Sequence, residues 1–205
     1  MWMYCILNII VFANIKCIFI PLISVLINTY QKRCFVFCLE YYKLHVIMFF
    51  TVNPNARVTG IDLTKAMLES LKMKFPDKEI ITVCGSYFDV PFGVEVFDAA
   101  VSVESLHHFS KEEKIPLYTK LRNALKPGGY FILTDYFADL VEQEAFFRQE
   151  LLRIRQEQKL PDDVFYHYDT PLTVEHEKEA LLEAGFSQVN EIERWEVTHT
   201  LKAVR

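Results

Sequence analysis

Glycine is scarce in this chain and absent from its first 59 residues. All six glycines come later, at positions 60, 85, 93, 128, 129 and 185. A loop that closes tightly around a nucleotide cofactor needs glycine, because its turn requires positive φ and a close approach of the backbone. The sequence therefore excludes a glycine-rich cofactor loop before residue 60.

A basic surface and a metal-type cysteine pattern are also missing. The net charge of −5 gives no electrostatic footprint for DNA, although RNA stays open as a substrate. Four of the five cysteines, at positions 5, 17, 34 and 38, match no zinc-binding spacing and have no histidine pairs beside them. The rest of the chain has the pattern of a cytosolic α/β domain, which argues against disulfides. We therefore expect no metal site and a cytoplasmic location.

Charge divides the chain into two unlike parts. Residues 1–52 hold four basic residues and one acidic residue, a net of +3. Residues 53–205 hold 18 basic and 26 acidic residues, a net of −8. The total length suits one domain of ordinary size. We therefore separate an atypical apolar N-terminal segment, residues 1–52, from a globular domain, residues 53–205.

Three interpretations fit the N-terminal segment. Its bias toward Ile, Phe, Asn, Tyr, Lys and Cys is typical of translated non-coding or frame-shifted AT-rich sequence, and we prefer this interpretation. Residues 3–30 are apolar over the length of a bilayer, which favours a membrane anchor. Lys16 argues against the anchor, because a charge at mid-span costs about 2.5–3.5 kcal/mol. In the third interpretation, residues 34–42 or 44–50 supply a buried strand.

From residue 57 onward, strand and helix patterns alternate. Apolar runs predict strands at 57–62, 78–88, 97–106 and 130–137, and amphipathic patterns predict helices at 64–75, 110–125, 139–160 and 173–184. Thr64 is placed to cap the first of these helices, and Ser110 with Glu113 forms a capping box for the second. Residues 186–205 predict two strands with no helix between them, an antiparallel hairpin. This order is typical of an α/β fold with a mostly parallel sheet and helices on both faces.

Four landmarks carry a resemblance to a known family. They are VTGIDLT (58–64), VCGSYFDVPF (83–92), FDAAVSVESLHHF (97–109) and LRNALKPGGYFILTDYF (121–137). With the closing hairpin, they make residues 53–205 resemble a class I (Rossmann-like) S-adenosylmethionine-dependent methyltransferase that lacks the N-terminal glycine-rich motif. The resemblance implies a Rossmann-like mixed sheet whose first strand and glycine loop are absent or replaced. An NAD-type oxidoreductase is the rival at the level of the fold, and the KPGG turn and closing hairpin argue against it.

The resemblance implies which residues bind S-adenosylmethionine. Asp62 matches the acidic residue that holds both ribose hydroxyls, a role that suits a carboxylate with two acceptor oxygens. Ser86 stands where the family commonly has an acidic residue for the adenine. Ser102 and Val103 match positions at the methionine end of the cofactor. The other cofactor-binding candidates are Leu63, Met67, Gly85 and Tyr87, with Phe88 as a second ring beside the base.

His107 is the candidate catalytic residue. An unperturbed histidine titrates near neutrality, so His107 suits a general base. Asp135 and Tyr136 are weaker candidates for contact with the acceptor. Packing roles are the alternatives for several of these residues: His107 and His108 as a helix-start pair, Asp62 as a charge at a helix N-terminus, and Met67, Tyr87 and Phe88 as core residues.

Three functions stay open at the level of the sequence. The resemblance implies methyl transfer from S-adenosylmethionine, with a small molecule as the expected acceptor. The missing glycine loop favours a catalytically inactive, truncated remnant instead. An apolar N-terminus favours a membrane-anchored form of the same domain. The predicted helix at 139–160 is also a candidate contact between copies in a homo-oligomer.

Overall fold

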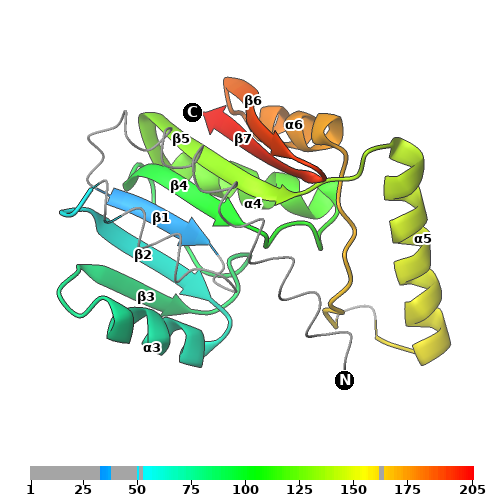
Figure 1. Ribbon diagram of the computed structural model, residues 1–205, viewed down its shortest axis with the longest axis horizontal. Helices are drawn as coiled ribbons and strands as arrows, with labels where there is room; N and C mark the ends of the chain where they lie inside the picture. Colours follow the sequence, from blue (N-terminus) through cyan, green and yellow to red (C-terminus); the bar gives the residue numbers. More distant parts are fainter. Residues whose placement is uncertain (1–32, 38–49, 51–52, 162–163) are drawn as a thin grey trace.

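The computed structural model describes residues 33–37, 50, 53–161 and 164–205. Seven strands form one sheet in the order β3-β2-β1-β4-β5-β7-β6 (Figure 1). The strands are β1 (Arg33–Phe37), β2 (Arg57–Asp62), β3 (Ile80–Cys84), β4 (Phe97–Val103), β5 (Leu125–Tyr136), β6 (Gln188–Trp195) and β7 (Thr198–Val204). The helices with assigned bounds are α3 (Lys65–Lys74), α4 (Lys111–Ala124), α5 (Val141–Gln158) and α6 (Val174–Glu183).

The sheet is mixed, as the sequence predicts. Strands β1 to β5 pair in parallel, whereas β7 runs antiparallel to both β5 and β6. The closing hairpin is therefore confirmed, and its two strands lie at one edge of the sheet. Parallel strands point their carboxyl ends the same way, so the ends of β1, β2, β3 and β4 lie along one side of the molecule.

The centre of the sheet is occupied by β1. It pairs with β2 on one side and β4 on the other, with Phe37 level with Ile61 and with Ser102. The predicted first strand is thus replaced rather than absent, and it comes from the run 34–42. The competing run, 44–50, lies outside the described residues except for Phe50, which is helical. The residues after Phe37, where the family places its glycine loop, also lie outside the described part.

Helices cover both faces of the sheet because the strand side chains alternate between two cores. On β5, Phe131 and Leu133 belong to a core that includes Leu117 and Tyr118 of α4 and Leu181 of α6. The neighbouring residues of β5 point to the second core. That second core contains Tyr130 and Ile132 with Leu68 and Leu71 of α3. The alternation places α4 and α6 on one face and α3 on the other.

Local sequence signals set the helix ends. The capping box at the start of α4 is confirmed: Ser110 accepts from the Glu113 N–H, and the Glu113 carboxylate accepts from the Ser110 N–H. Thr64 occupies the N-cap position of α3, but its side chain makes no capping hydrogen bond. Its own N–H instead donates to Asp62 at 2.6 Å. The carboxylate that ends β2 therefore also lies at the N-terminus of α3.

The long charged helix predicted at 139–160 is α5, whose Glu144 lies 2.8 Å from Nδ1 of His176 on α6. Figure 1 shows α5 on the side toward which the carboxyl ends of the parallel strands point, with the segment before α6 running between α5 and the sheet. No helix in the described ranges is both long and apolar enough to cross a bilayer. The anchor predicted for residues 3–30 lies outside the described residues.

Candidate functional site

The carboxyl ends of β2, β1 and β4 form the first part of the site. Asp62 ends β2 and lies one residue beyond Ile61, which is level with the end of β1. Ser102 lies level with that same end on the other side, in β4. The register of the sheet therefore places Asp62 and Ser102 on either side of one strand end.

Asp62 is buried, with 8% of its surface exposed. Its Oδ1 accepts the N–H of Thr64, and its backbone carbonyl accepts the N–H of Gly85. The negative charge is favourable at this place because the N-terminus of α3 carries a partial positive charge. Leu63, the next residue, is exposed, and Met67 on α3 is partly buried and packs against the core that contains Leu68.

The segment after β3 forms a compact turn. Ser86 accepts the N–H of Phe88 on its hydroxyl at 3.1 Å and the N–H of Val90 on its carbonyl at 2.9 Å. A Cβ on Gly85 would lie 2.9 Å from the Val90 side chain, so only glycine fits without a shift. The Tyr87 hydroxyl donates to the carbonyl of Ser105 at 3.1 Å. The predicted adenine-binding segment is thus tied directly to the loop after β4.

Tyr87 and Phe88 also pack as core residues. Both are partly buried against the core on the α4 face, with ring centroids 5.3 Å apart. Val103 is partly buried against the opposite core. Ser102 is fully buried, and its hydroxyl lies 2.9 Å from that of Ser105. Ser105 thus contacts two predicted site residues, although the sequence did not single it out.

His107 and Asp135 form the buried polar centre of the site. Nδ1 of His107 lies 2.5 Å from Oδ1 of Asp135. The other oxygen of Asp135 accepts the N–H groups of Leu106 at 2.8 Å and Ser105 at 3.3 Å. Asp135, at the end of β5, thereby fixes both the loop and the ring of His107.

A second carboxylate contacts the other side of the imidazole. Nε2 of His107 lies 3.4 Å from Oδ1 of Asp169, and the same oxygen lies 3.2 Å from Nδ1 of His108. Burial acts to lower the pKa of His107, but the charge and hydrogen bonding of Asp135 and Asp169 outweigh it and raise that pKa to about 10. The ring is therefore protonated at neutral pH in this arrangement.

The two carboxylates respond to the same contacts. Burial acts to raise the pKa of Asp135, but the charge of His107 and its hydrogen bond outweigh burial and lower it. Hydrogen bonds from His107 and then His108 hold the pKa of Asp169 well below its usual range. Both carboxylates are thus ionised partners of one imidazolium.

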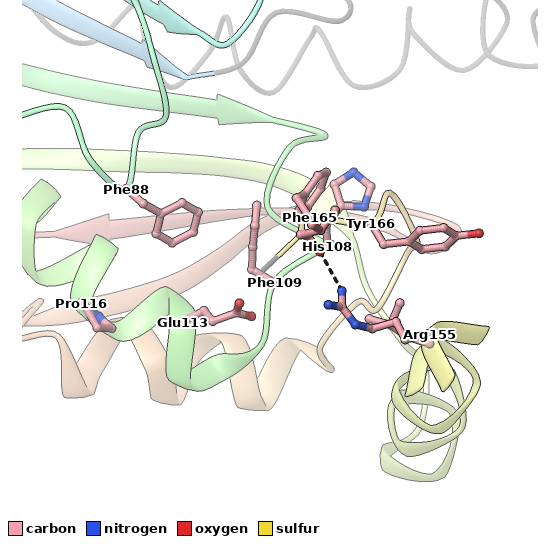
Figure 2. A pocket seen from close by; sticks show the side chains of 10 residues that line it. Phe88, His108, Phe109, Glu113, Pro116, Arg155, Phe165 and Tyr166 are labelled. Atoms are coloured by element: carbon pink, nitrogen blue, oxygen red, sulfur yellow. Dashed lines mark hydrogen bonds between the residues drawn. The ribbon is translucent and has the colours of Figure 1, made fainter. Parts of the chain in front are cut away.

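An aromatic pocket opens beside His108. Its volume is about 420 Å³, and Figure 2 shows its side chains gathered from the segment after β3, the start of α4, α5 and the segment after α5. Phe109 and Phe165 stack at a centroid distance of 5.6 Å, and Phe88 meets Phe109 edge-on at 4.8 Å. Arg155 donates to the carbonyl of Val164 at 2.9 Å and so holds the segment after α5 at the pocket.

The sequence missed Asp169, which lies far from every predicted motif in a segment without regular structure. Thr170 brings it into place by donating its N–H to the carbonyl of His107 at 2.9 Å. No spacing rule links positions 107 and 169, because a tertiary contact alone joins them. The adjacent histidines His107 and His108 were the one feature of the sequence that indicated a polar cluster with a further partner at this place.

Comparisons with known proteins agree with this geometry. Residues 45–133 match a family described as a methyltransferase domain. The biotin biosynthesis bifunctional protein BioHC of Teredinibacter turnerae is 27% identical over 141 residues, which cover 67% of this chain and 22% of that protein. A fatty-acid O-methyltransferase of Mycolicibacterium smegmatis is 33% identical over 85 residues, covering 42% of this chain and 30% of that protein. The chain thus spans less than a third of either relative.

Solved structures show the same fold. A putative O-methyltransferase from Nostoc punctiforme superposes with a TM-score of 0.67 at 21% identity, covering 90% of this chain and 55% of that one. An S-adenosylmethionine-dependent methyltransferase from Mesorhizobium loti gives 0.62 at 17% identity, covering 90% of this chain and 96% of that one. The domain match, the strand order and the closing antiparallel pair agree, and the chain resembles the class I S-adenosylmethionine-dependent methyltransferases in its fold and over residues 45–133 of its sequence.

Proposed function

We propose that this chain binds S-adenosylmethionine across the ends of β2, β1 and β4 and transfers its methyl group to a small-molecule acceptor. The position of Asp62 carries the proposal. Its carboxylate lies at the tip of β2 beside the central strand, where open α/β sheets bind their ligands. Thr64 uses one of about four lone-pair positions on the carboxylate, so Asp62 can also accept hydrogen bonds from a vicinal diol.

The residues around Asp62 suit the remaining parts of the cofactor. In this proposal Asp62 holds the ribose, and Ser102 lies toward the methionine end. The adenine lies between Leu63 and Met67 on one side and the turn Gly85–Ser86–Tyr87 on the other. S-adenosylmethionine, when bound, supplies an electrophilic methyl group on its sulfonium. The chain contributes mainly orientation, which is the larger part of catalysis in a simple displacement.

His107 is the proposed general base of this reaction. Asp135 fixes Nδ1, so Nε2 is the nitrogen that takes the proton of the acceptor. With Asp169 in contact, the ring is already protonated and cannot act as a base. Catalysis therefore requires two changes at Nε2: Asp169 leaves, and the ring releases that proton to solvent before the acceptor takes the position. Asp169 is 61% exposed at its side chain, so the exchange does not disturb the core.

A small molecule suits the space beside this pair. The aromatic pocket has a volume within the range of about 300–1,000 Å³ that ligand sites usually have. Its lining is apolar on the faces of Phe88, Phe109 and Phe165, with His108 at its edge. The similarity to a fatty-acid O-methyltransferase supports an acceptor with an apolar body and an oxygen nucleophile.

A catalytically inactive remnant is the second candidate. The observation that favours it is the absence of glycine from the first 59 residues, which include all those that follow β1 before β2. A side chain at each of those positions opposes the close approach of a cofactor backbone. The membrane-anchored form is tested separately, since recovery of the expressed full chain entirely in the soluble fraction would eliminate it.

Calorimetric titration of S-adenosylmethionine into the purified chain tests the proposal. We expect binding in the micromolar range that Asp62→Asn weakens about 10- to 100-fold, because a hydrogen bond to a charged group contributes about 1.5–3 kcal/mol. Asp77→Asn is the matched control, since Asp77 is exposed and lies beyond α3. A folded chain that binds no cofactor would contradict the proposal and favour the remnant.

A further inference from the structure

Three potential metal ligands converge beside the aromatic pocket. They are His107, His108 and Asp169, whose ligand atoms all lie within 4.8 Å of one another. The Asp169 oxygen lies 3.4 Å from Nε2 of His107 and 3.2 Å from Nδ1 of His108. Two ligands bound tetrahedrally to zinc at about 2.0–2.1 Å are about 3.3 Å apart. The two separations from the Asp169 oxygen therefore match those of a tetrahedral zinc site, and the two histidine nitrogens lie within 4.8 Å of each other.

The buried ligand has the support that metal-binding histidines require. A ligating histidine usually donates its other ring N–H to a carboxylate, which fixes the tautomer and the ring orientation. Asp135 takes this role at Nδ1 of His107 and leaves Nε2 facing Asp169. Asp135 is itself held by the N–H groups of Leu106 and Tyr136. The arrangement is rigid before any ligand arrives.

The exposed ligand is also held in place. Thr170 is buried, and its N–H donates to the carbonyl of His107 at 2.9 Å. The carbonyl of Tyr168 lies 3.3 Å from Nδ1 of His108 and offers a further oxygen beside the cluster. His107 is 6% exposed at its side chain and Asp169 is 61% exposed. The cluster thus has one closed side and one side open to solvent.

We propose that His107, His108 and Asp169 bind a divalent transition metal, with Zn²⁺ as the best match. Two imidazoles and one carboxylate form the ligand set of many catalytic zinc sites, in which the fourth position stays open. No metal site was predicted from the sequence, because the cysteine spacings match no zinc pattern. A histidine pair that a distant aspartate completes has no characteristic spacing. In the metal-bound state, Zn²⁺ would take the place between the three side chains that hydrogen bonds now occupy, and the protons of those hydrogen bonds would be released to solvent.

The metal would extend the proposed methyl transfer, and this role rests on that proposed function. An acceptor hydroxyl or thiol bound at the open position loses its proton more easily because the metal stabilises the anion. The acceptor proton then goes to solvent, the acceptor oxygen or sulfur forms the new bond to the methyl group, and the bond between that methyl and the cofactor sulfur breaks. His107 then acts as a ligand instead of the base.

Titration of the chelator-treated full chain with Co²⁺, followed by visible absorption, tests the site. We expect saturable one-to-one binding without the thiolate charge-transfer band that a cysteine site would give, and displacement of Co²⁺ by Zn²⁺. Asp169→Asn and His108→Ala should each weaken binding about 100-fold or more, because loss of a ligand should cost at least as much as the 10–100-fold seen for loss of a residue that only supports a ligand. Asp77→Asn changes an exposed carboxylate beyond α3, away from the cluster, and should leave the affinity unchanged.

Two results would overturn the metal site. One is the absence of saturable Co²⁺ and Zn²⁺ binding by a folded chain. The other is binding that both Asp169→Asn and His108→Ala retain. Circular dichroism establishes that each variant is folded, and Asp169 suits the test because its side chain is largely exposed. Cofactor titration of the same samples reports separately on methyl-donor binding, so failure of the metal site and failure of the proposed function give different results.

Discussion

The carboxylate of Asp135 and the imidazole of His107 join two strand ends through one buried contact of 2.5 Å. Asp135 is the last residue but one of β5, and His107 lies in the loop after β4. Each is at most 6% exposed at its side chain. The loop after β4 is therefore held by an ion pair that lies within the protein and not on its surface.

Removal of one partner of this pair should destabilise the fold. Asp135→Asn leaves the His107 imidazolium without its buried counter-charge, and we expect the free energy of unfolding to fall by about 3–5 kcal/mol. Urea unfolding followed by circular dichroism measures the change. Asp169→Asn is the control, because it removes an exposed partner of the same ring and should cost about 1 kcal/mol or less. Equal losses of unfolding free energy in Asp135→Asn and Asp169→Asn would contradict this difference between a buried and an exposed partner.

A second buried ion pair joins α4 to α6. Nζ of Lys114 lies 2.5 Å from Oε2 of Glu177, and the Tyr118 hydroxyl donates to the other oxygen of Glu177. Lys114 and Glu177 are 2% and 1% exposed at their side chains. Burial, followed by the charge and hydrogen bond of Glu177, raises the pKa of Tyr118 well above its ordinary value. The tyrosine is therefore a neutral donor at any ordinary pH.

Glu177→Gln should lower the free energy of unfolding by about 3–5 kcal/mol, because it leaves a buried ammonium without its counter-charge. The double variant Lys114→Met with Glu177→Gln removes both charges and keeps an acceptor oxygen for the Tyr118 hydroxyl, so it should lose less than Glu177→Gln alone. Thermal or urea unfolding of the variants gives the comparison. If the double variant were less stable than Glu177→Gln, the loss of unfolding free energy would come from the missing ion pair and not from an unpaired buried charge.

Much of the fold could be predicted because it depends on local pattern. The strand 57–62 has the bounds predicted from its apolar run, and the capping box of Ser110 and Glu113 forms as its spacing requires. The central strand was harder to place, since several apolar runs near it have the same character and only long-range pairing selects residues 33–37.

The site could be predicted only in part, for a related reason. Asp62 and His107 follow strands with clear signatures, so their place at the sheet edge follows from the topology. Asp169 follows no such signature, and its contact with His107 depends on the path of the segment between α5 and α6. A tertiary contact between distant segments produces no periodic pattern in the sequence from which it could be predicted. The partner that changes the chemistry of His107 therefore became evident only from the structure.

Glu144 on α5 should control the order of that segment. Its carboxylate accepts the N–H of Thr173 at 2.8 Å and lies 2.8 Å from Nδ1 of His176. Glu144→Ala removes both contacts and leaves a buried N–H unpaired, which costs about 1–3 kcal/mol. We expect faster amide hydrogen exchange between residues 164 and 173, measured by mass spectrometry. Glu150 lies on the same helix, and its ion pair among the described residues is with Arg153. Glu150→Ala should therefore leave that exchange unchanged.

Tyr87 gives a way to separate packing from cofactor binding. Its hydroxyl donates to Ser105 at 3.1 Å, while its ring packs beside Phe88. Tyr87→Phe keeps the ring and removes the hydrogen bond, so the free energy of unfolding should fall by about 0.5–1.5 kcal/mol.

If the ring alone flanks the adenine, S-adenosylmethionine should bind Tyr87→Phe nearly as well as the parent chain, whereas Tyr87→Leu should weaken binding. Tyr166→Phe is the matched control for loss of a hydroxyl, because Tyr166 lines the aromatic pocket and its hydroxyl accepts from Gln158 at 3.4 Å. Equal cofactor affinity in Tyr87→Leu and the parent chain would assign Tyr87 to the core alone and place the adenine elsewhere.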